Sequence, residues 1–493
     1  MTAIILAAGM GSRLVPITET RPKCMVKVAG KPILQYQIEA YRDAGVTKIV
    51  VVCGYFSTRI KAFVARYGKL VECLCNEDYE VTNNMYSLYL ALAKLAPKQP
   101  VMISNGDVVF EPAIIQGILA QPGSLIAVDA GSYDEESMKI TVADGHVRSI
   151  SKAVTADDAF GNSIDVYKFE GGFLAEFKQL LSDTIEVEGN RNDWTEVAIE
   201  KCLAQNPSSV RPYEICGKKW VEVDNYHDLQ LADEVFSTLK LEAIDLFFID
   251  LDGTIFLGDK VIEGAPAFIR SLQDTGREFK LLSNNSSKSK QEYVGLLSGY
   301  GIEVDTNAIV LSSDGAIAHI KAMGHERVFV LGTESLRMSV EDAGLSTNDR
   351  NYDCVLVGYD TELSYQKLKQ AALLLHGGCG FFATHGDMVC PTVDGPIPDI
   401  GSILALLEKA TGRAPDKTFG KPDKQMVQFL LEEKQLNPSF VASTGAGIYT
   451  DMLAARNVGS PFILVLSGET KRDEVDQIAD FPDLIVQSVA SLF

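Results

Sequence analysis

The sequence of 493 residues lacks the features that mark several large classes of protein. It has 45 basic against 66 acidic residues, a formal net charge of −21, which argues against a dedicated nucleic-acid binder because such proteins need basic surface. No apolar run approaches the roughly 18 residues of a membrane span, and no basic segment precedes the first apolar run as in a signal peptide. The nine cysteines, without doubled C-x-x-C spacing, predict free thiols in a reducing compartment. We therefore expect a cytoplasmic protein with no membrane span and no nucleic-acid partner.

The length of the chain and the alternation of its apolar and amphipathic segments predict two α/β domains. Single cores stop growing near roughly 250–300 residues, and 46% of these residues are hydrophobic, enough for more than one core. Short apolar runs such as 3–7 alternate with amphipathic stretches such as 33–44, as in βαβ units on a mostly parallel sheet. A second series begins with a buried strand expected at 244–251, after a closing helix and connector expected at 229–241. The predicted domains are residues 1–240 and 241–493.

The first 70 residues are basic within this acidic chain, with 11 basic and 3 acidic residues, a net charge of +8. They contain a glycine-rich turn after the first expected strand, Leu6-Ala7-Ala8-Gly9-Met10-Gly11-Ser12-Arg13-Leu14, and then Lys23. Such a turn lets backbone N–H groups approach phosphate oxygens, and Arg13 and Lys23 would add charge-assisted contacts. The glycines alone are equally consistent with a tight turn that binds nothing.

The whole string resembles the signature of the sugar-nucleotidyltransferase superfamily. The segments 83–88, 138–152 and 220–224 resemble the branch that contains choline-phosphate and 2-aminoethylphosphonate cytidylyltransferases, and the resemblance covers most of residues 1–237. It implies transfer of a cytidylyl group from CTP to a small phosphorylated alcohol, which gives a CDP-alcohol and pyrophosphate.

The resemblance also implies roles for individual residues. Lys23 would stabilise the transition state and Arg13 would hold phosphates. Asp107 and Asp224 each follow an expected strand, and would converge on Mg²⁺. The implied nucleotide contacts are Leu6, Ala7, Ala8, Gly9, Gly11, Asn84, Ser87 and Gly106. The implied acceptor contacts are Lys152, Asp165 and Glu222.

The acceptor pocket departs from the choline-type pattern. Where those members read G-E-Y-I-G-I, residues 161–166 read Gly-Asn-Ser-Ile-Asp-Val, which loses a carboxylate and an aromatic and gains Asp165. Because aromatic faces and negative charge hold a quaternary ammonium, we interpret the change as favouring a polyol phosphate, with phosphocholine or a phosphonate as alternatives. Trp194 and Glu196 could line this pocket, although an aromatic on an amphipathic helix is also typical of a core.

The second half opens with Asp250-Leu251-Asp252-Gly253-Thr254 at the end of its apolar strand. Two carboxylates at this spacing lie on one side of an extended chain, which suits a nucleophile and a proton donor. The pattern resembles motif I of the haloacid dehalogenase superfamily. Segments 280–287 and 419–422 resemble motifs II and III of subclass IIA, a group of phosphatases, with an inserted α/β cap at about 315–400. The resemblance spans nearly all of residues 244–493.

By this resemblance Asp250 attacks phosphorus to form an aspartyl phosphate, Asp252 transfers protons, and Lys421 neutralises the phosphoryl oxygens. His385 stands where relatives usually carry Asn. The implied phosphate contacts are Thr254, Ser283 and Asn284. The implied ligands of Mg²⁺ are Asp250, Asp252 and Asp451.

Motif IV lacks one member. Relatives read G-D-x-x-x-T-D, and this chain reads Gly445-Ala446-Gly447-Ile448-Tyr449-Thr450-Asp451. Ala446 offers no oxygen to a cation, so we predict weaker Mg²⁺ binding and impaired hydrolysis. Compensation by Asp451 or another acid and a deliberately introduced substitution are the alternatives.

The sequence therefore predicts a bifunctional enzyme with two Rossmann-like domains, a mixed-sheet nucleotidyltransferase and a haloacid dehalogenase core with an α/β cap. Its partners would be CTP or another NTP and a small phosphorylated alcohol, with Mg²⁺ as cofactor, and a homodimer is left open. One alternative is a nucleotidyltransferase with a non-catalytic binding or oligomerisation module. Another is a hexose-1-phosphate nucleotidyltransferase that uses a different NTP.

Overall fold

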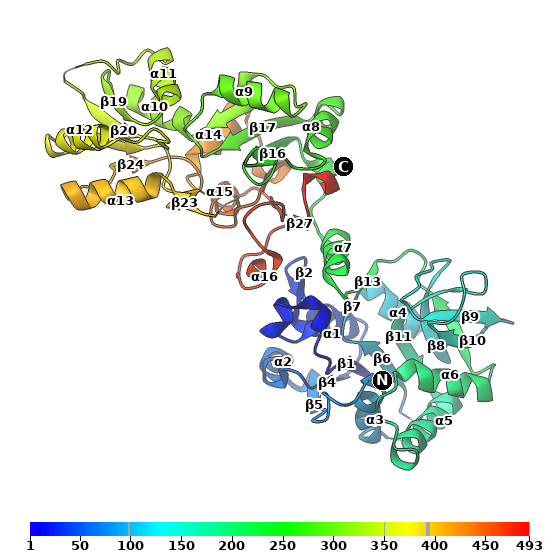
Figure 1. Ribbon diagram of the computed structural model, residues 1–493. Helices are drawn as coiled ribbons and strands as arrows, with labels where there is room; N and C mark the ends of the chain where they lie inside the picture. The colour runs from blue at the N-terminus through cyan, green and yellow to red at the C-terminus, as the bar shows by residue number, and fades with distance from the viewer. Residues whose placement is uncertain (97–98, 350, 391–394, 493) are drawn as a thin grey trace. The chain divides into compact units, whose positions relative to one another are not determined.

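The computed structural model describes residues 1–96, 99–349, 351–390 and 395–492, and the chain divides into two compact units, Met1–Ser237 and Thr238–Phe493 (Figure 1). The closing helix and connector expected at 229–241 are present, but the helix begins earlier than expected, because α7 spans Tyr226–Phe236. The Asn225 side chain accepts hydrogen bonds from the backbone of His227 and Asp228, and the Asp228 side chain accepts one from the Asn225 backbone. This capping box begins the helix three residues before the apolar pattern does.

The N-terminal unit is built on a nine-stranded mixed sheet in the order β10-β9-β11-β6-β1-β4-β5, with β8 joining β11 to β12. Its strands are β1 Thr2–Ala7, β4 Lys48–Cys53, β5 Val71–Cys75, β6 Val101–Asn105, β8 Ser124–Ala130, β9 Lys139–Ala143, β10 His146–Ser151, β11 Gly161–Phe169 and β12 Val210–Glu214. Strand β1 is parallel to β4 and β6, and β4 is parallel to β5. Strand β11 is antiparallel to β6, β8 and β9. The mixed sheet is the predicted one, although the expectation of a mostly parallel sheet fails on the β11 side.

The turn between β9 and β10 shows why that side is antiparallel. Asp144 and Gly145 form a two-residue turn in which both residues have a positive φ, 52° and 74°. This geometry matches the twist of a β-hairpin, and Asp-Gly is its strongest sequence signal. The chain therefore folds back at this point instead of crossing over through a helix.

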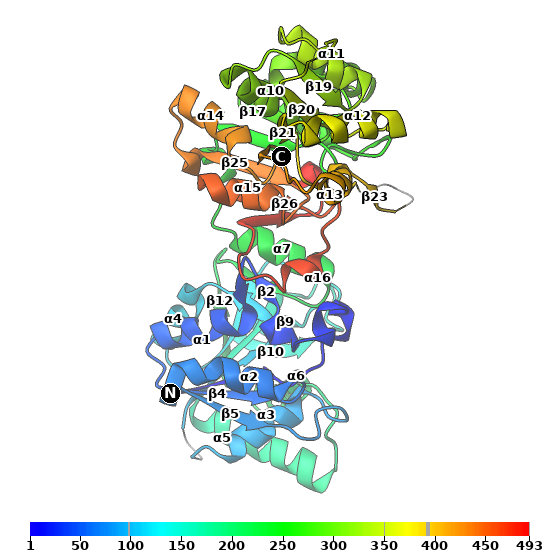
Figure 2. The same cartoon turned by 90° about the vertical axis from the view of Figure 1, so that its left-hand side faces the viewer.

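Helices cover both faces of this sheet (Figure 2). They are α1 Ile33–Asp43, α2 Ser57–Val64, α3 Asn84–Ala93, α4 Pro112–Ala120, α5 Gly171–Ser182 and α6 Thr195–Gln205. Alternate residues of β1 face opposite sides: Ala3 and Ile5 pack with α1, α2 and α4, whereas Ile4 and Leu6 pack with α3, α5 and α6. The carboxyl ends of β1 and β6 are left open for a site.

The C-terminal unit has a six-stranded parallel core sheet in the order β18-β17-β14-β25-β26-β27. These strands are β14 Leu246–Asp250, β17 Glu278–Ser283, β18 Ile309–Leu311, β25 Val441–Gly445, β26 Phe462–Val465 and β27 Leu484–Val486. The main core helices are α8 Ala265–Asp274, α9 Lys290–Gly299, α14 Gln425–Lys434 and α15 Asp451–Val458. Phe247 and Ile249 pack with α8 and α9, and Phe248 packs with α14 on the other face. Among the described residues no helix is long and apolar enough to cross a membrane.

The inserted cap has its own parallel sheet in the order β19-β20-β21-β24. Its strands are β19 Val328–Leu331, β20 Cys354–Val357, β21 Gly380–Ala383 and β24 Lys417–Thr418, and its helices are α10 Ser312–Ala322, α11 Glu334–Asp342, α12 Tyr365–His376 and α13 Ile400–Thr411. The cap therefore extends past the expected end at 400, because the chain adds β24 to the cap sheet before it returns to the core. The predicted fold class, two α/β units with an inserted cap, is confirmed.

Candidate active sites

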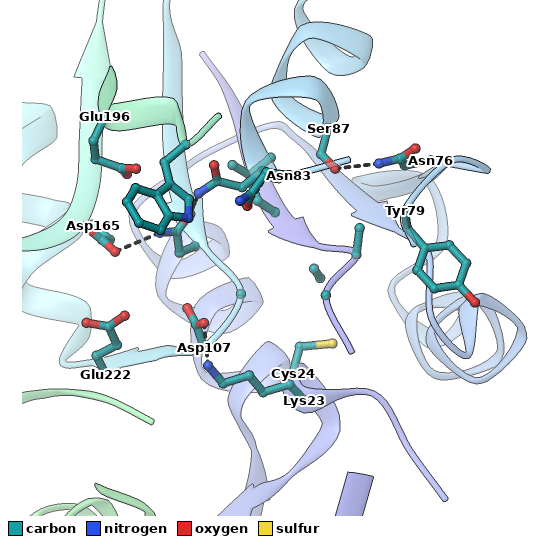
Figure 3. A pocket seen from close by; sticks show the side chains of 18 of the residues that line it. Lys23, Cys24, Asn76, Tyr79, Asn83, Ser87, Asp107, Asp165, Glu196 and Glu222 are labelled. Carbon is teal, nitrogen blue, oxygen red and sulfur yellow. Dashed lines mark hydrogen bonds and ion pairs between the residues drawn. The ribbon is translucent and has the colours of Figure 1, made fainter. Parts of the chain in front are cut away.

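A pocket of about 290 Å³ lies at the carboxyl ends of β1 and β6 in the N-terminal unit (Figure 3). The structure brings most of the predicted site residues to its wall: Leu6, Ala7, Ala8, Gly9, Arg13, Lys23, Asn84, Ser87, Gly106, Asp107, Lys152, Asp165 and Glu222. Residues that the sequence did not single out also line it: Cys24, Asn76, Tyr79, Thr82, Asn83, Asn105 and Met138. Asn76 directly follows β5, as Gly106 and Asp107 follow β6, so its place at a strand end was a usable signal.

The side chains gather in two groups on opposite sides of this pocket (Figure 3): Asn76, Tyr79 and Ser87 on one side, and Asp165, Glu196 and Glu222 on the other. Lys23 and Asp107 lie between the two groups. We call the first group the amide end and the second the acid end. A reaction that joins two substrates needs this arrangement, with one substrate at each end and charged groups where they meet.

Lys23 sits at the centre of an ion-pair cluster. Its Nζ lies 2.7 Å from Asp107 Oδ2 and 2.5 Å from Asp224 Oδ1, and Arg13 Nη2 lies 2.8 Å from Asp224 Oδ2. Burial lowers the pKa of Lys23, but attraction to Asp107 and Asp224 outweighs burial, so the net shift is upward. Burial raises the pKa of Asp224, and Lys23 and Arg13 outweigh it to bring this pKa below its usual value. Lys23 and Asp224 are therefore both charged near neutral pH.

Two backbone features place this cluster. Gly11 has a φ of 68°, and a Cβ there would lie 2.9 Å from Lys23 Cβ, so glycine allows Lys23 to pack against the loop. The short strands β7 (Val108–Phe110) and β13 (Trp220–Glu222) pair antiparallel, and the Val223 N–H donates to the Asp107 carbonyl. This pairing brings the two segments that carry Asp107 and Asp224 together although 116 other residues separate them in the sequence.

The same cluster fits a divalent cation. Asp107, Glu222 and Asp224 each offer a carboxylate oxygen, and the three oxygens lie within 4.8 Å of one another. Asp107 Oδ1 is buried and accepts no hydrogen bond from the part of the chain that the structure describes. Burial, with the nearby Asp165, Asp107 and Asp224, raises the pKa of Glu222 well above its usual value. A bound cation would reduce the repulsion among these carboxylates and would give Asp107 Oδ1 a partner.

Hydrogen bonds fix the amide end. Asn76 Nδ2 donates to Thr82 Oγ1 and Ser87 Oγ, each at 3.0 Å, and Asn76 Oδ1 accepts from the Asp78 N–H. Asn84 Oδ1 accepts from the Thr195 N–H at 2.8 Å, which ties the start of α3 to the start of α6. The wall of this end is therefore held by its own polar contacts before any ligand binds.

At the acid end, Asp165 and Glu196 share one tyrosine. Tyr167 Oη lies 2.9 Å from Asp165 Oδ1 and 2.8 Å from Glu196 Oε1, and both carboxyl groups are buried. One hydroxyl proton cannot serve two carboxylates, so one of the carboxyl groups is protonated and donates. Burial and the neighbouring Glu196 raise the pKa of Asp165 to about 8, and burial also raises the pKa of Glu196.

Local strand geometry puts Asp165 in this position. The register of β11 shifts between Ser163 and Tyr167, and Asp165 has a φ of 54°, which is uncommon for a residue other than glycine. Asn105 Nδ2 donates to Asp165 Oδ2 at 2.7 Å. Trp194 is 45% exposed rather than core, and Lys152 Nζ lies 5.4 Å from its ring centroid, so both side chains stand at the mouth of the pocket.

The second site lies where β14 and β25 end side by side in the C-terminal unit. The Lys421 ammonium forms ion pairs with Asp250 and with Asp451, the latter with Nζ 2.6 Å from Oδ1. Burial and Asp451 raise the pKa of Asp250 well above its usual value, and burial raises that of Asp252. Thr254 Oγ1 lies 3.4 Å from Asp250 Oδ2, and Ser283 hydrogen-bonds Asp252. The predicted set therefore meets at one strand edge.

The side-chain amide of Asn284 forms its hydrogen bonds with other residues of the chain. Its Oδ1 accepts from the Lys421 N–H at 2.7 Å, and its Nδ2 donates to the Lys421 carbonyl at 3.0 Å and to Asp387 Oδ2 at 2.8 Å. Its amide therefore fixes the backbone of Lys421 and leaves little capacity for a phosphate. His385 is buried in the cap, with Nε2 3.2 Å from Asp399 Oδ2.

Two glycines, Gly253 and Gly468, pack closely against the Ala446 side chain. This side chain is buried, and a Cβ added to Gly468 would lie 2.2 Å from the Ala446 Cβ, while one added to Gly253 would lie 3.2 Å from it. In the described ranges, only Asp107, Glu222 and Asp224 bring three such ligand groups within 4.8 Å of one another. The carboxylates of the second site, two of them paired with Lys421, form no such group among the described residues.

Comparisons with known proteins agree with the two halves. Residues 3–159 match the family described as MobA-like NTP transferase domain. Residues 247–346 match the family described as haloacid dehalogenase-like hydrolase, and residues 418–492 match a HAD-hydrolase-like family.

Relatives of each half are known. The CTP:phosphoglutamine cytidylyltransferase of Campylobacter jejuni is 30% identical over 256 residues, which cover 48% of this chain and 100% of that protein. The 5'-nucleotidase YutF of Bacillus subtilis is 30% identical over 244 residues, 49% of this chain and 95% of that protein. The crystal structure of 4-nitrophenylphosphatase from Thermotoga maritima is 37% identical, with a TM-score of 0.49 over 51% of this chain and 97% of that one.

Fold, sites and relatives together define an enzyme with two phosphate-handling domains. The chain belongs to the MobA-like NTP transferases through its N-terminal unit and to the haloacid dehalogenase-like hydrolases through its C-terminal unit. The predicted fusion of a nucleotidyltransferase with a phosphatase-type domain is confirmed.

Proposed function

We propose that the N-terminal unit transfers a cytidylyl group from CTP to a small phosphorylated alcohol and releases pyrophosphate. The observation that carries the proposal is the position of the Lys23, Asp107 and Asp224 cluster between the amide end and the acid end of one pocket. The relative from Campylobacter jejuni, named a CTP:phosphoglutamine cytidylyltransferase, supports CTP as donor and a small phosphorylated acceptor.

In this mechanism the acceptor's phosphate oxygen attacks the α-phosphorus of CTP in line, and pyrophosphate leaves. The loop of residues 8–11 presents backbone N–H groups to the phosphates, and Arg13 pairs with their charge. Lys23, held by two carboxylates, keeps its ammonium charged and oriented toward the oxygens on which charge develops. Asp107, Glu222 and Asp224 would hold Mg²⁺, which when bound supplies further neutralisation of phosphate charge.

The acid end favours an acceptor rich in hydroxyl groups. A carboxylic acid beside a carboxylate can donate one hydrogen bond and accept others. A hydroxyl group on the acceptor can accept the first and donate to the others. Of the aromatic residues at this end, Trp194 lines the pocket and Tyr167 binds the carboxyl groups through its hydroxyl, whereas a quaternary ammonium is normally enclosed by several aromatic faces. An acceptor with a primary ammonium is the second candidate, because three carboxyl groups surround this end.

A matrix of substrates tests the transferase. The full chain is assayed with CTP, UTP, GTP and ATP against glycerol phosphate, phosphocholine, 2-aminoethylphosphonate and a hexose 1-phosphate, and pyrophosphate release is measured. We expect CTP with glycerol phosphate to give the fastest release. Faster release with phosphocholine would contradict the hydroxyl-rich acceptor, and release with a hexose 1-phosphate and another NTP would contradict the cytidylyltransferase itself.

We further propose that the C-terminal unit binds phosphate monoesters and hydrolyses them slowly. Asp250 is placed to attack phosphorus and Asp252 to protonate the leaving alkoxide, with Lys421 fixed against Asp250. The missing oxygen at Ala446 supports slow turnover, because repulsion between Asp250 and an incoming phosphate is less screened.

A matched pair of variants tests the second site. Gly253 and Gly468 pack against Ala446, so Ala446→Asp and Ala446→Asn are both checked for folding by circular dichroism before they are assayed. We expect Ala446→Asp to raise Mg²⁺-dependent hydrolysis of p-nitrophenyl phosphate at least about tenfold, because the carboxylate adds a ligand, and Ala446→Asn to stay near the starting rate. Equal, measurable rates for the starting chain and Ala446→Asp would refute impaired hydrolysis. No hydrolysis by either chain, with phosphate esters still bound, would support a non-catalytic module.

A further inference from the structure

Two cysteines lie side by side behind the amide end of the N-terminal pocket. Cys53 ends β4 and Cys75 ends β5, and the two residues are directly paired in the parallel register. Their sulfur atoms are 3.5 Å apart. Neighbouring strands are about 4.8 Å apart, within the roughly 4.4–6.8 Å between Cα atoms that disulfides span. The pair can therefore be bridged without rebuilding the sheet.

The surroundings of the pair differ in a way that suits oxidation. Cys53 is fully buried, whereas Cys75 is partly exposed. Lys61 on α2 hydrogen-bonds Cys75, and this contact raises the pKa of Lys61. A peroxide in solution can reach a partly exposed sulfur atom and not a fully buried one. Cys75 is thus placed to react first and Cys53 to resolve the product.

The pair is joined directly to the pocket wall. Cys75 precedes Asn76, whose N–H donates to the Cys53 carbonyl at 2.8 Å. Cys53 precedes Gly54, and the N–H of the next residue, Tyr55, donates to the Ala8 carbonyl at 3.2 Å. Ala8 and Asn76 both line the pocket. A bond between the two sulfurs would therefore act on the wall through Asn76, one residue after Cys75, and through Tyr55, two residues after Cys53.

We propose that Cys53 and Cys75 form a disulfide on reaction with a hydroperoxide, and that this bond weakens nucleotide binding in the pocket. The Cys75 thiolate attacks the peroxide, which gives a sulfenic acid and hydroxide, and the Cys53 thiol then displaces water from the sulfenic acid. Two thiols and one hydrogen peroxide thus give one disulfide and two waters. The effect on nucleotide binding rests on the proposed function, whereas formation of the bond does not.

Closing the sulfur contact from 3.5 Å to about 2 Å turns the two side chains and also draws the strand ends together by part of that distance. Misplacement of a binding group by about 1 Å can reduce function about a hundredfold. Because the two strands share the shift, each moves by less than this, and we expect the dissociation constant for CTP to rise about tenfold on oxidation. Treatment with dithiothreitol should restore the value of the reduced chain.

The test treats the full chain with hydrogen peroxide, blocks free thiols with an alkylating agent and maps disulfides by peptide mass spectrometry. We expect the Cys53–Cys75 bridge in the starting chain and in Cys73→Ser and Cys216→Ser, and no bridge in Cys75→Ser or Cys53→Ala. Binding of CTP is measured in parallel by calorimetry, and Cys75→Ser should bind CTP equally before and after peroxide.

A bridge that involves Cys73 or Cys24 instead, or no bridge, would overturn the inference. A mapped Cys53–Cys75 bridge that leaves CTP affinity unchanged would overturn the link to the pocket. If the reduced chain does not bind CTP at all, the proposed nucleotide is wrong while the mapped bridge still stands, so the two failures are distinct.

Discussion

Replacing Lys23 with methionine removes an ammonium that contacts both Asp107 and Asp224. The Lys23 side chain is only 14% exposed, so water cannot replace the lost charge fully. Removing a donor aimed at charge that develops in the transition state typically reduces kcat by about 10²–10³, or about 2.7–4 kcal/mol. We therefore expect Lys23→Met to release pyrophosphate about 10²–10³ times more slowly at saturating CTP and acceptor.

The matched control is Lys31→Met. It makes the same substitution in the same basic segment, but Lys31 pairs with Glu39, with Nζ 2.5 Å from Oε2, and contributes no side chain to the pocket wall that the structure describes. A partly exposed ion pair of this kind contributes little to stability. The rate of pyrophosphate release by Lys31→Met should therefore stay within about twofold of that of the starting chain. A loss of less than about threefold in Lys23→Met, or equal losses in the two variants, would refute the role given to Lys23.

Two further predictions concern buried polar groups. Asn284→Ala should reduce hydrolysis about tenfold in the Ala446→Asp background, because the Lys421 backbone loses two hydrogen bonds worth about 1 kcal/mol each; an unchanged rate would contradict this positioning role. Asp165 binds its proton up to about pH 8 when folded, against a usual pKa of 3.8, so its contribution to stability is complete at low pH and falls as the pH rises toward 8. Asp165→Asn should therefore flatten the decline of Tm between about pH 5 and 8, measured by scanning fluorimetry, and an identical decline would contradict the raised pKa.

Much of both sites could be predicted because it lies at strand ends. Asp107 and Asp224 lie two residues after β6 and β13, Asp250 ends the buried strand β14, and the carboxyl ends of neighbouring strands meet at one edge. The apolar pattern placed those strands within one or two residues. The identity of the chemistry, by contrast, came from resemblance and not from spacing.

What escaped prediction depends on local geometry or on distant contacts. The contact of Tyr167 with both acidic groups needs the register shift in β11 and the positive φ of Asp165, which no sequence pattern signals here. The bonds from Asn284 to Lys421 join residues 137 positions apart. The start of α7 was readable from Asn225 and Asp228, whose spacing is that of a capping box.

Phosphorus-31 NMR of a single reaction mixture tests the proposed transfer most directly. The full chain is incubated with CTP, Mg²⁺ and glycerol phosphate, in parallel with Asp107→Asn, which removes one charge from the cluster between the two ends of the pocket. We predict that pyrophosphate and a new CDP-linked diphosphate appear together and in equal amounts with the starting chain, and at least about a hundredfold more slowly with Asp107→Asn. Loss of CTP without a diphosphate product, or equal rates for the two chains, would contradict cytidylyl transfer at this site.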